Sequence, residues 1–230
     1  NLAAKHGFTR EEQDAFSLES HRRAAAAIAA GHFKTQIVPV ELKSKKGPVI
    51  FDTDEHVRKE AKPEDFSKLR PAFKKDGSVT AGNASGINDA GAAVVLMEAA
   101  AAAKAGVKPL ARLVAYAHAG VEPHIMGEGP IPAVQKVFQK AGLKPSDMDV
   151  VESNEAFAVQ AMTVTKGLGL DPAKVNPNGG AVALGHPIGA TGAILTVKCL
   201  YELQRTGGRY GLVTMCIGGG QGIAAIFERL

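Results

Sequence analysis

The sequence predicts a layered α/β fold, on three observations. Between residues 107 and 215, short apolar runs that suit strands alternate with helical segments that end at glycine. The last two strands, at 210–215 and 223–227, have a link too short for a crossover, so they form an antiparallel hairpin. Hydrophobic residues make up 45% of the 230 residues and charged residues 22%, which excludes wholesale disorder.

The first 80 residues differ from this α/β part. Residues 1–31 are predicted to be helical, with a capping box at Thr9 and Glu12 and an end at Gly31. Residues 32–80 are rich in lysine, acidic residues and proline. They predict an excursion with short strands rather than a compact unit.

The remaining elements follow in order from a small-residue segment that begins at Val79. Each helix is bounded by glycine or proline, which favours its end or its beginning. We expect a helix at 89–104, a strand at 110–117, a helix from Pro132 to Gly142, a strand at 149–152, a helix at 154–166, and a helix that runs from the glycine-rich loop 176–192 to about residue 205.

Charge and cysteine content narrow the function classes. The net charge is +4, which suits a phosphate-bearing ligand. The basic stretch lacks the interleaved aromatic residues that are typical of a nucleic-acid binder. The two cysteines exclude a disulfide scaffold, and no CxxC pair begins a structural zinc site. No apolar stretch is long enough to span a membrane, and the first residues lack a signal-peptide pattern. We therefore expect a cytoplasmic protein.

Three segments place a polar or reactive residue at the end of an apolar element. In the first, V-V-E-S-N-E-A-F-A at 150–158, Asn154 lies between a strand and a helix. Its amide either caps the helix or holds a water or carbonyl oxygen at the carboxyl edge of a sheet, where α/β proteins bind ligands.

The second segment surrounds His186 with glycines at 179, 180, 185, 189 and 192. Glycine at this density permits close approach of a ligand or of other backbone. A helix follows, and its positive end favours the neutral imidazole, which can accept a proton. A lone histidine is more often structural, but the Gly-His-Pro-x-Gly frame favours a functional one.

The third segment, V-T-M-C-I-G-G-G-Q-G at 213–222, places Cys216 at the end of a buried strand. Cys216 is either a buried apolar thiol or a reactive thiol beside backbone N–H groups, such as that of Gly218, that stabilise an oxyanion. Cys199 lies inside an amphipathic helix and is expected to be inert.

Together these segments closely resemble the C-terminal part of the thiolases, in their NEAF, GHPxGxTG and CxGGG boxes. The boxes begin here at Asn154, Gly185 and Cys216. Three further segments resemble the biosynthetic, short-chain branch of the family, and the resemblance covers essentially the whole chain: L-R-P-A-F at 69–73, V-T-A-G-N-A-S-G-I-N-D at 79–89 and M-G-E-G-P-I-P-A at 126–133.

The resemblance implies a thiolase-like layered αβαβα fold. Residues 1–86 would be the remainder of the loop domain, 87–106 the last elements of the N-terminal half, and 107–230 the C-terminal domain. It also implies a dimer or tetramer.

The implied activity is that of an acyl-CoA C-acyltransferase. Two acetyl-CoA, or acetyl-CoA and a short acyl-CoA, would condense reversibly to a 3-ketoacyl-CoA and coenzyme A, in fatty acid or polyhydroxyalkanoate metabolism. The resemblance makes His186 the base to the nucleophile and, with a water on Asn154, an oxyanion hole. Cys216 would shuttle the alpha proton, and the N–H of Gly218 would complete a second oxyanion hole. Coenzyme A would be substrate or product, with no metal and no redox nucleotide.

The implied coenzyme and acyl contacts come from several segments. They are Arg58 near the nucleotide, Ser85 on the pantetheine arm, Phe73, Ala81, Ala84 and Phe157 lining the tunnel, and Met126 bordering the acyl pocket. His21 stands where the family often has glutamine and is a weaker coenzyme contact. A solvated surface cation is the alternative for Arg58.

One departure concerns the nucleophile. The family's nucleophilic cysteine lies in the N-terminal half, and Cys216 matches the second, acid/base cysteine. We therefore expect this chain to be inactive alone and to pack with that missing half. The alternative is a catalytically incomplete fragment that only binds coenzyme A. Sterol-carrier thiolases carry an HDCF-like box in place of NEAF, and ketosynthase-type enzymes lack the CxGGG hairpin.

Overall fold

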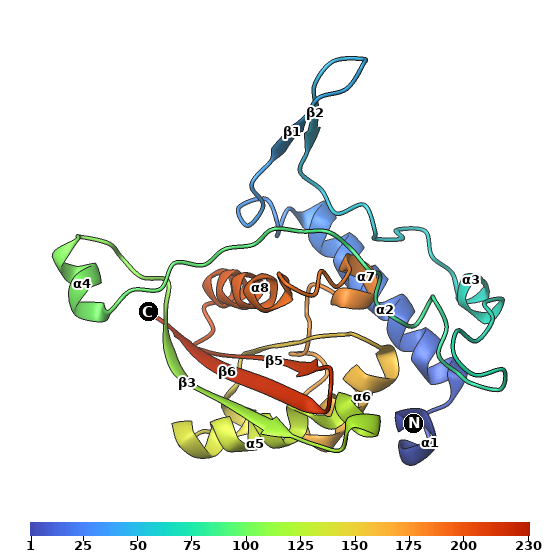
Figure 1. The fold of residues 1–230 in the computed structure, drawn as a ribbon. Coiled ribbons are helices and arrows are strands. Elements are labelled where there is room, and N and C mark those ends of the chain that lie inside the picture. Colours follow the sequence, from blue (N-terminus) through green and yellow to red (C-terminus); the bar gives the residue numbers. More distant parts are fainter.

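A four-stranded sheet forms the centre of the molecule in the computed structural model, which describes residues 1–230 (Figure 1). The strands are β3 (Ala111–Gly120), β4 (Val150–Ser153), β5 (Tyr210–Ile217) and β6 (Gln221–Arg229), in the order β3-β6-β5-β4. β4 and β5 are parallel and the other pairs are antiparallel. The predicted terminal hairpin is confirmed, and each strand lies within a few residues of its expected position.

Helices cover both faces of this sheet. α5 (Pro130–Ala141) packs on one face and α8 (Thr191–Thr206) on the other (Figure 1). The α5 side holds the main apolar core, which includes Val134, Val137, Met148, Leu212 and Ile226. The α8 side holds a smaller one of Val150, Leu195, Cys199, Leu203 and Val213. The layered arrangement predicted from the alternation of elements is therefore confirmed.

The N-terminal helical region is split in two, α1 (Leu2–His6) and α2 (Arg10–Ala30). The capping box forms as predicted, with Thr9 and Glu12 bonded reciprocally, and Gly31 ends α2 in the left-handed conformation. α2 contacts the short helix α7 (Ala181–Leu184) and α6 (Ala158–Gly167), so it packs directly on the C-terminal part of the chain.

Residues 32–80 form the expected excursion. β1 (Val40–Leu42) and β2 (Val49–Phe51) pair antiparallel in a hairpin that projects away from the body of the molecule (Figure 1). α3 (Pro63–Ser67) follows it. Two short 3₁₀ turns are also present, η1 (Pro123–Glu128) and η2 (Pro145–Asp147).

The helix predicted at 89–104 is wrong for most of its length. Only α4 (Ala99–Lys104) is helical, and the residues before it cross the molecule in an extended conformation (Figure 1). Their side chains are exposed, Ile87 at 99% and Val95 at 90%. A short helix needs an apolar surface to pack on, and this segment has none.

Two other helix beginnings differ from expectation. α5 begins at Pro130 rather than Pro132 and ends before Gly142 as predicted. α6 begins at Ala158, and its N-cap is Phe157, so the interpretation of Asn154 as a helix cap is wrong. The N–H of Asn154 donates to the Thr214 carbonyl at 2.9 Å, which extends strand pairing past β4 and delays the helix.

Candidate active site

Asn154 lies at the carboxyl end of β4. The preceding residue, Ser153, pairs with Thr214 on the parallel strand β5. The Asn154 side chain is fully buried, and its Nδ2 lies 3.3 Å from Nε2 of His186. Its Oδ1 is buried without a hydrogen-bond partner. A buried acceptor of this kind is costly unless a water or ligand donates to it, so Asn154 is equipped to hold one.

His186 reaches Asn154 from the glycine-rich loop. Its backbone N–H donates to the Gly86 carbonyl at 3.1 Å, and its Nδ1 lies 2.7 Å from Oγ1 of Thr191. Burial lowers the pKa of the imidazole below its ordinary value of 6.5. The neutral ring is therefore the dominant form at neutral pH, which suits a proton acceptor.

Cys216 lies two residues beyond Thr214 on β5, toward the same edge of the sheet as Asn154. It is a free thiol, 9% exposed, and burial raises its pKa to about 11. Such a thiol stays protonated at neutral pH, so its resting chemistry is that of an acid.

Gly218 follows in the turn between β5 and β6. It is exposed, and its N–H makes no hydrogen bond to other backbone. Gly220 has a φ of 92°, and a Cβ there would lie 2.3 Å from the Val121 carbonyl oxygen, so this turn position requires glycine. The turn thus leaves the N–H of Gly218 free beside Cys216.

The extended segment before α4 joins the first two boxes. Ser85 donates to the Ala156 carbonyl through both its N–H and its hydroxyl, each at 3.0 Å. Ala84 forms a β-bridge with Phe157, whose ring lies edge-on to Phe73 at 6.2 Å between centroids. Three of the predicted tunnel residues, Phe73, Ala84 and Phe157, therefore lie together with Ser85 beside Asn154 and His186.

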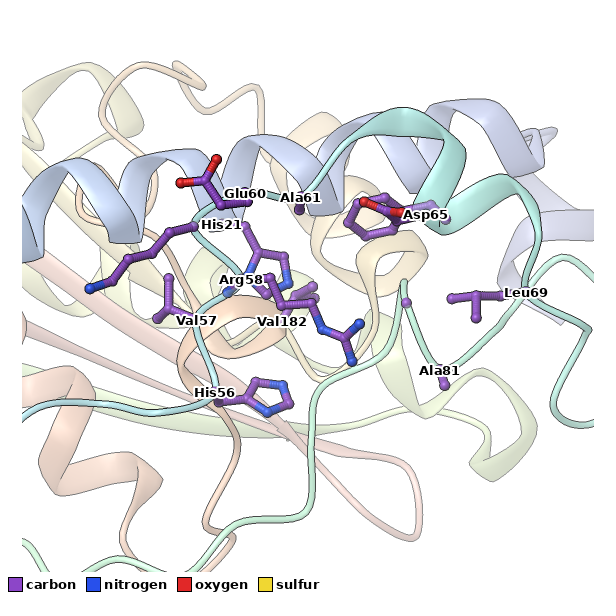
Figure 2. A pocket seen from close by; sticks show the side chains of 13 residues that line it. His21, His56, Val57, Arg58, Glu60, Ala61, Asp65, Leu69, Ala81 and Val182 are labelled. Atoms are coloured by element: carbon purple, nitrogen blue, oxygen red, sulfur yellow. The ribbon is translucent and has the colours of Figure 1, made fainter.

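A cavity of about 620 Å³ lies farther along the N-terminal part of the chain (Figure 2). Arg58, His21 and Ala81 all line it, and no carboxylate is within ion-pair distance of the Arg58 guanidinium. The Nδ1 of buried His21 accepts from the Arg58 N–H at 3.1 Å. Burial, then His56 and Arg58, lower the pKa of His21 to about 4, so the ring stays neutral as that acceptor. The unpaired guanidinium suits an anionic group.

Met126 comes from a different element, η1, which packs against β5 and β6. The backbone next to η1 contacts the β5–β6 turn, because Val121 N–H donates to the Gly220 carbonyl at 2.7 Å. Met126 is therefore held near the Cys216 end of the sheet.

Sequence reasoning missed the buried carboxylate that supports this site. Glu155 accepts hydrogen bonds from Ser20 Oγ at 2.6 Å, Asn176 Nδ2 at 2.9 Å and Val182 N–H at 3.2 Å. It thereby ties α2 and the glycine-rich loop to the residue after Asn154. The sequence signal for this role was a glutamate in the otherwise apolar segment 150–158, because a buried carboxylate requires hydrogen-bond partners.

A buried ion pair lies under the same loop and was also missed. Lys198 Nζ lies 2.7 Å from Glu152 Oε2 and donates to the Gly179 carbonyl at 2.7 Å. The side chains are 6% and 0% exposed. Burial, partly offset by Lys198, raises the pKa of Glu152 to about 6.

No group of three or more histidine, cysteine or acidic side chains is arranged to hold a metal ion. No helix has both the length and the apolar character needed to cross a bilayer.

Comparison with known proteins gives matches along nearly the whole chain. Residues 1–100 match the family model described as the thiolase N-terminal domain, and residues 107–229 match that of the thiolase C-terminal domain. The beta-ketothiolase BktB of Cupriavidus necator is 66% identical over 231 residues, and the acetyl-CoA acetyltransferase of Allochromatium vinosum is 56% identical. Each comparison covers 100% of this chain but 59% of the relative, so the chain spans about three fifths of their length.

Solved structures match as closely. The acetyl-CoA acetyltransferase of Bacillus anthracis superposes with a TM-score of 0.97 at 50% identity, over 100% of this chain and 58% of the other. Human mitochondrial 3-ketoacyl-CoA thiolase in complex with CoA gives 0.93 at 46% identity, over 100% and 57%.

Proposed function

The chain belongs to the thiolase family and has its fold, and from this premise we propose that it carries the acid/base half of an acetyl-CoA acetyltransferase site. The single observation that carries the proposal is the pairing of Asn154 Nδ2 with His186 Nε2 at 3.3 Å, with Cys216 at the end of the adjoining strand. The names of its relatives support acetyl-CoA and short acyl-CoA as substrates, with coenzyme A as product.

The first half-reaction moves an acyl group from coenzyme A to a thiol. The attacking group must be a thiolate, and His186 accepts its proton because the neutral imidazole has a free lone pair. Cys199 is fully buried with a strongly raised pKa, and Cys216 has a pKa of about 11. Neither suits the role of nucleophile, so we take the nucleophile from outside these 230 residues.

The second half-reaction joins an enolate to the acyl group. Once His186 Nε2 carries a proton it donates to the enolate oxygen, and a water held by Asn154 Oδ1 donates to the same oxygen. In the first half-reaction the Cys216 thiol gives its proton to the departing coenzyme A thiolate, and the resulting Cys216 thiolate then accepts the alpha proton of the second acetyl-CoA. In the reverse thiolysis the Cys216 thiol returns that proton to the departing enolate carbon. The free N–H of Gly218 donates to the other oxyanion.

The coenzyme would bind between the cavity lined by Arg58 and the cluster around Ser85. Arg58 and the cavity that it lines accept the phosphate-bearing end, with His21 and Ala81 alongside. The pantetheine arm passes the cluster of Ser85, Ala84, Phe157 and Phe73, and Met126 borders the acyl pocket. No residue here requires a metal or a redox nucleotide for these steps.

Partners and compartment are proposed from the same premise. Exposed apolar residues of the extended segment, such as Val95 and Leu96, support packing with the N-terminal half of a thiolase. We further propose residues 1–86 as the remainder of the loop domain, 87–106 as the last elements of the N-terminal half and 107–230 as the C-terminal domain. We also propose a dimer or tetramer as the assembly and a cytoplasmic location.

The decisive experiment is thiolysis of acetoacetyl-CoA with free coenzyme A. We compare the 230-residue chain, the same chain extended to the length of its relatives, and the extended chain with Asn154→Ala or His186→Ala. The proposal expects turnover only in the extended chain, with a loss of about 10²–10³-fold in either variant. Equal turnover in the Asn154→Ala variant would contradict it.

Calorimetric titration of coenzyme A into the 230-residue chain tests the alternative of a binding-only fragment. Binding that weakens in Arg58→Ala, together with no turnover in the extended chain, would favour that alternative.

A further inference from the structure

Thr191 is the first residue of α8 and is 3% exposed. Its Oγ1 makes two short contacts, at 2.7 Å to Nδ1 of His186 and at 2.9 Å to the carbonyl oxygen of Pro187. The second contact is the usual bond of a helical threonine to the carbonyl four residues earlier.

The hydroxyl has one proton for these two contacts. The Pro187 carbonyl can only accept, and besides the N–H groups of Ala190 at 2.8 Å and Thr191 at 2.9 Å it takes the Thr191 hydroxyl, whose Oγ1 lies at hydrogen-bond distance, 2.9 Å away. The Thr191 proton therefore lies on that contact. The contact to His186 then needs a proton from the ring, which makes Nδ1 the donor.

A neutral imidazole carries one N–H, so a proton on Nδ1 leaves Nε2 as a lone pair. That lone pair faces the Nδ2 group of Asn154, which can only donate. Both neighbours of the ring thus favour the same tautomer, and the orphaned Oδ1 of Asn154 follows from the same orientation.

We propose that Thr191 is a positioning residue that fixes the Nδ1–H tautomer of His186 and so keeps Nε2 free to accept a proton. The value of this tautomer for catalysis rests on the function proposed above, because a base at Nε2 needs the lone pair there. The tautomer itself does not depend on any activity, so the two proposals can fail separately.

The test uses the protein labelled with ¹⁵N in histidine, and reads the two ring nitrogens of His186 by long-range ¹H–¹⁵N NMR. Spectra are taken about two pH units above the ordinary histidine pKa of about 6.5, where the ring is neutral. His186→Gln identifies the signals. The unsubstituted protein should show protonated Nδ1 and unprotonated Nε2, and the opposite pattern would overturn the proposal without any variant at Thr191.

Thr191→Val removes the hydroxyl at nearly constant volume, and Thr191→Ser keeps it as the matched control. The loss of one neutral hydrogen bond should shift the tautomer ratio toward Nε2–H by about fivefold to tenfold in Thr191→Val, and leave it unchanged in Thr191→Ser. An unchanged ratio in a folded Thr191→Val protein would overturn the proposal. If that variant does not fold, the same comparison is made between Thr191→Ser and Thr191→Ala.

In the extended, active protein the same variants give a kinetic readout. Thr191→Val should lower kcat about tenfold with little change in KM for coenzyme A, and Thr191→Ser should restore it. A purely structural role would move stability without moving the tautomer ratio.

Discussion

Lys198 offers a sharp test of how the glycine-rich loop is held. Lys198→Met removes the ammonium from Glu152, whose Oε1 already lacks a hydrogen bond and whose Oε2 would lose its bond to Lys198. It also removes the donor to the Gly179 carbonyl. Breaking a buried pair by removing one partner costs about 3–5 kcal/mol, because the remaining charge has no compensation.

The assay is urea unfolding at equal protein concentration for all variants. With an m-value of about 3 kcal/mol/M, the loss lowers the midpoint by about 1 M or more. The matched control is the double variant Glu152→Leu, Lys198→Met, which removes both charges of the pair and should be clearly more stable than the single variant. A single variant that loses less than about 1 kcal/mol, or a double variant no better than the single, would refute this account of the pair.

Three further predictions concern the site and its surroundings. Because burial lowers the pKa of His186, its neutral, basic form persists below pH 6.5. The kcat/KM of the extended protein should therefore fall only below that pH, and an inflection above pH 7 would contradict this. Cys216, with a pKa of about 11, should react with iodoacetamide far more slowly at neutral pH than an unfolded cysteine, and its rate should rise about tenfold per pH unit; fast neutral labelling would count against it. Gly180→Ala places a Cβ 2.1 Å from Cδ of Glu155 and should lower the free energy of unfolding by about 1–3 kcal/mol, measured by thermal unfolding. In the control Gly189→Ala the new Cβ meets nothing within 4 Å, so stability should hardly change. Equal effects of the two substitutions would refute the steric argument.

The sequence patterns predicted those elements whose signals are local. The capping box of α2, the glycine end of α5 and the short hairpin link at β5 and β6 each depend on a few neighbouring residues. The helix at 89–104 failed because alanine-rich composition measures propensity only, and the segment before α4 has no surface to cover it.

The site divides in the same way. Asn154, His186 and Cys216 each stand in a distinctive local sequence motif. The family resemblance also predicted that Asn154 and His186 lie close together. The contacts of Glu155 with Ser20 and Asn176 join residues far apart in sequence, so no local pattern contains them. Asn176 also has a φ of 46°, a left-handed conformation that asparagine tolerates and that only the backbone reveals.

The exposed crossing at 87–98 makes this molecule a natural candidate for a split protein. A cut there would separate an N-terminal piece from a C-terminal piece that carries the three boxes. The pieces would still share the bonds from Ser20 to Glu155, from Ser85 to Ala156 and from His186 to Gly86. The site is thus assembled across a non-covalent seam, and its geometry is set by complementation between two surfaces rather than by the continuity of the chain.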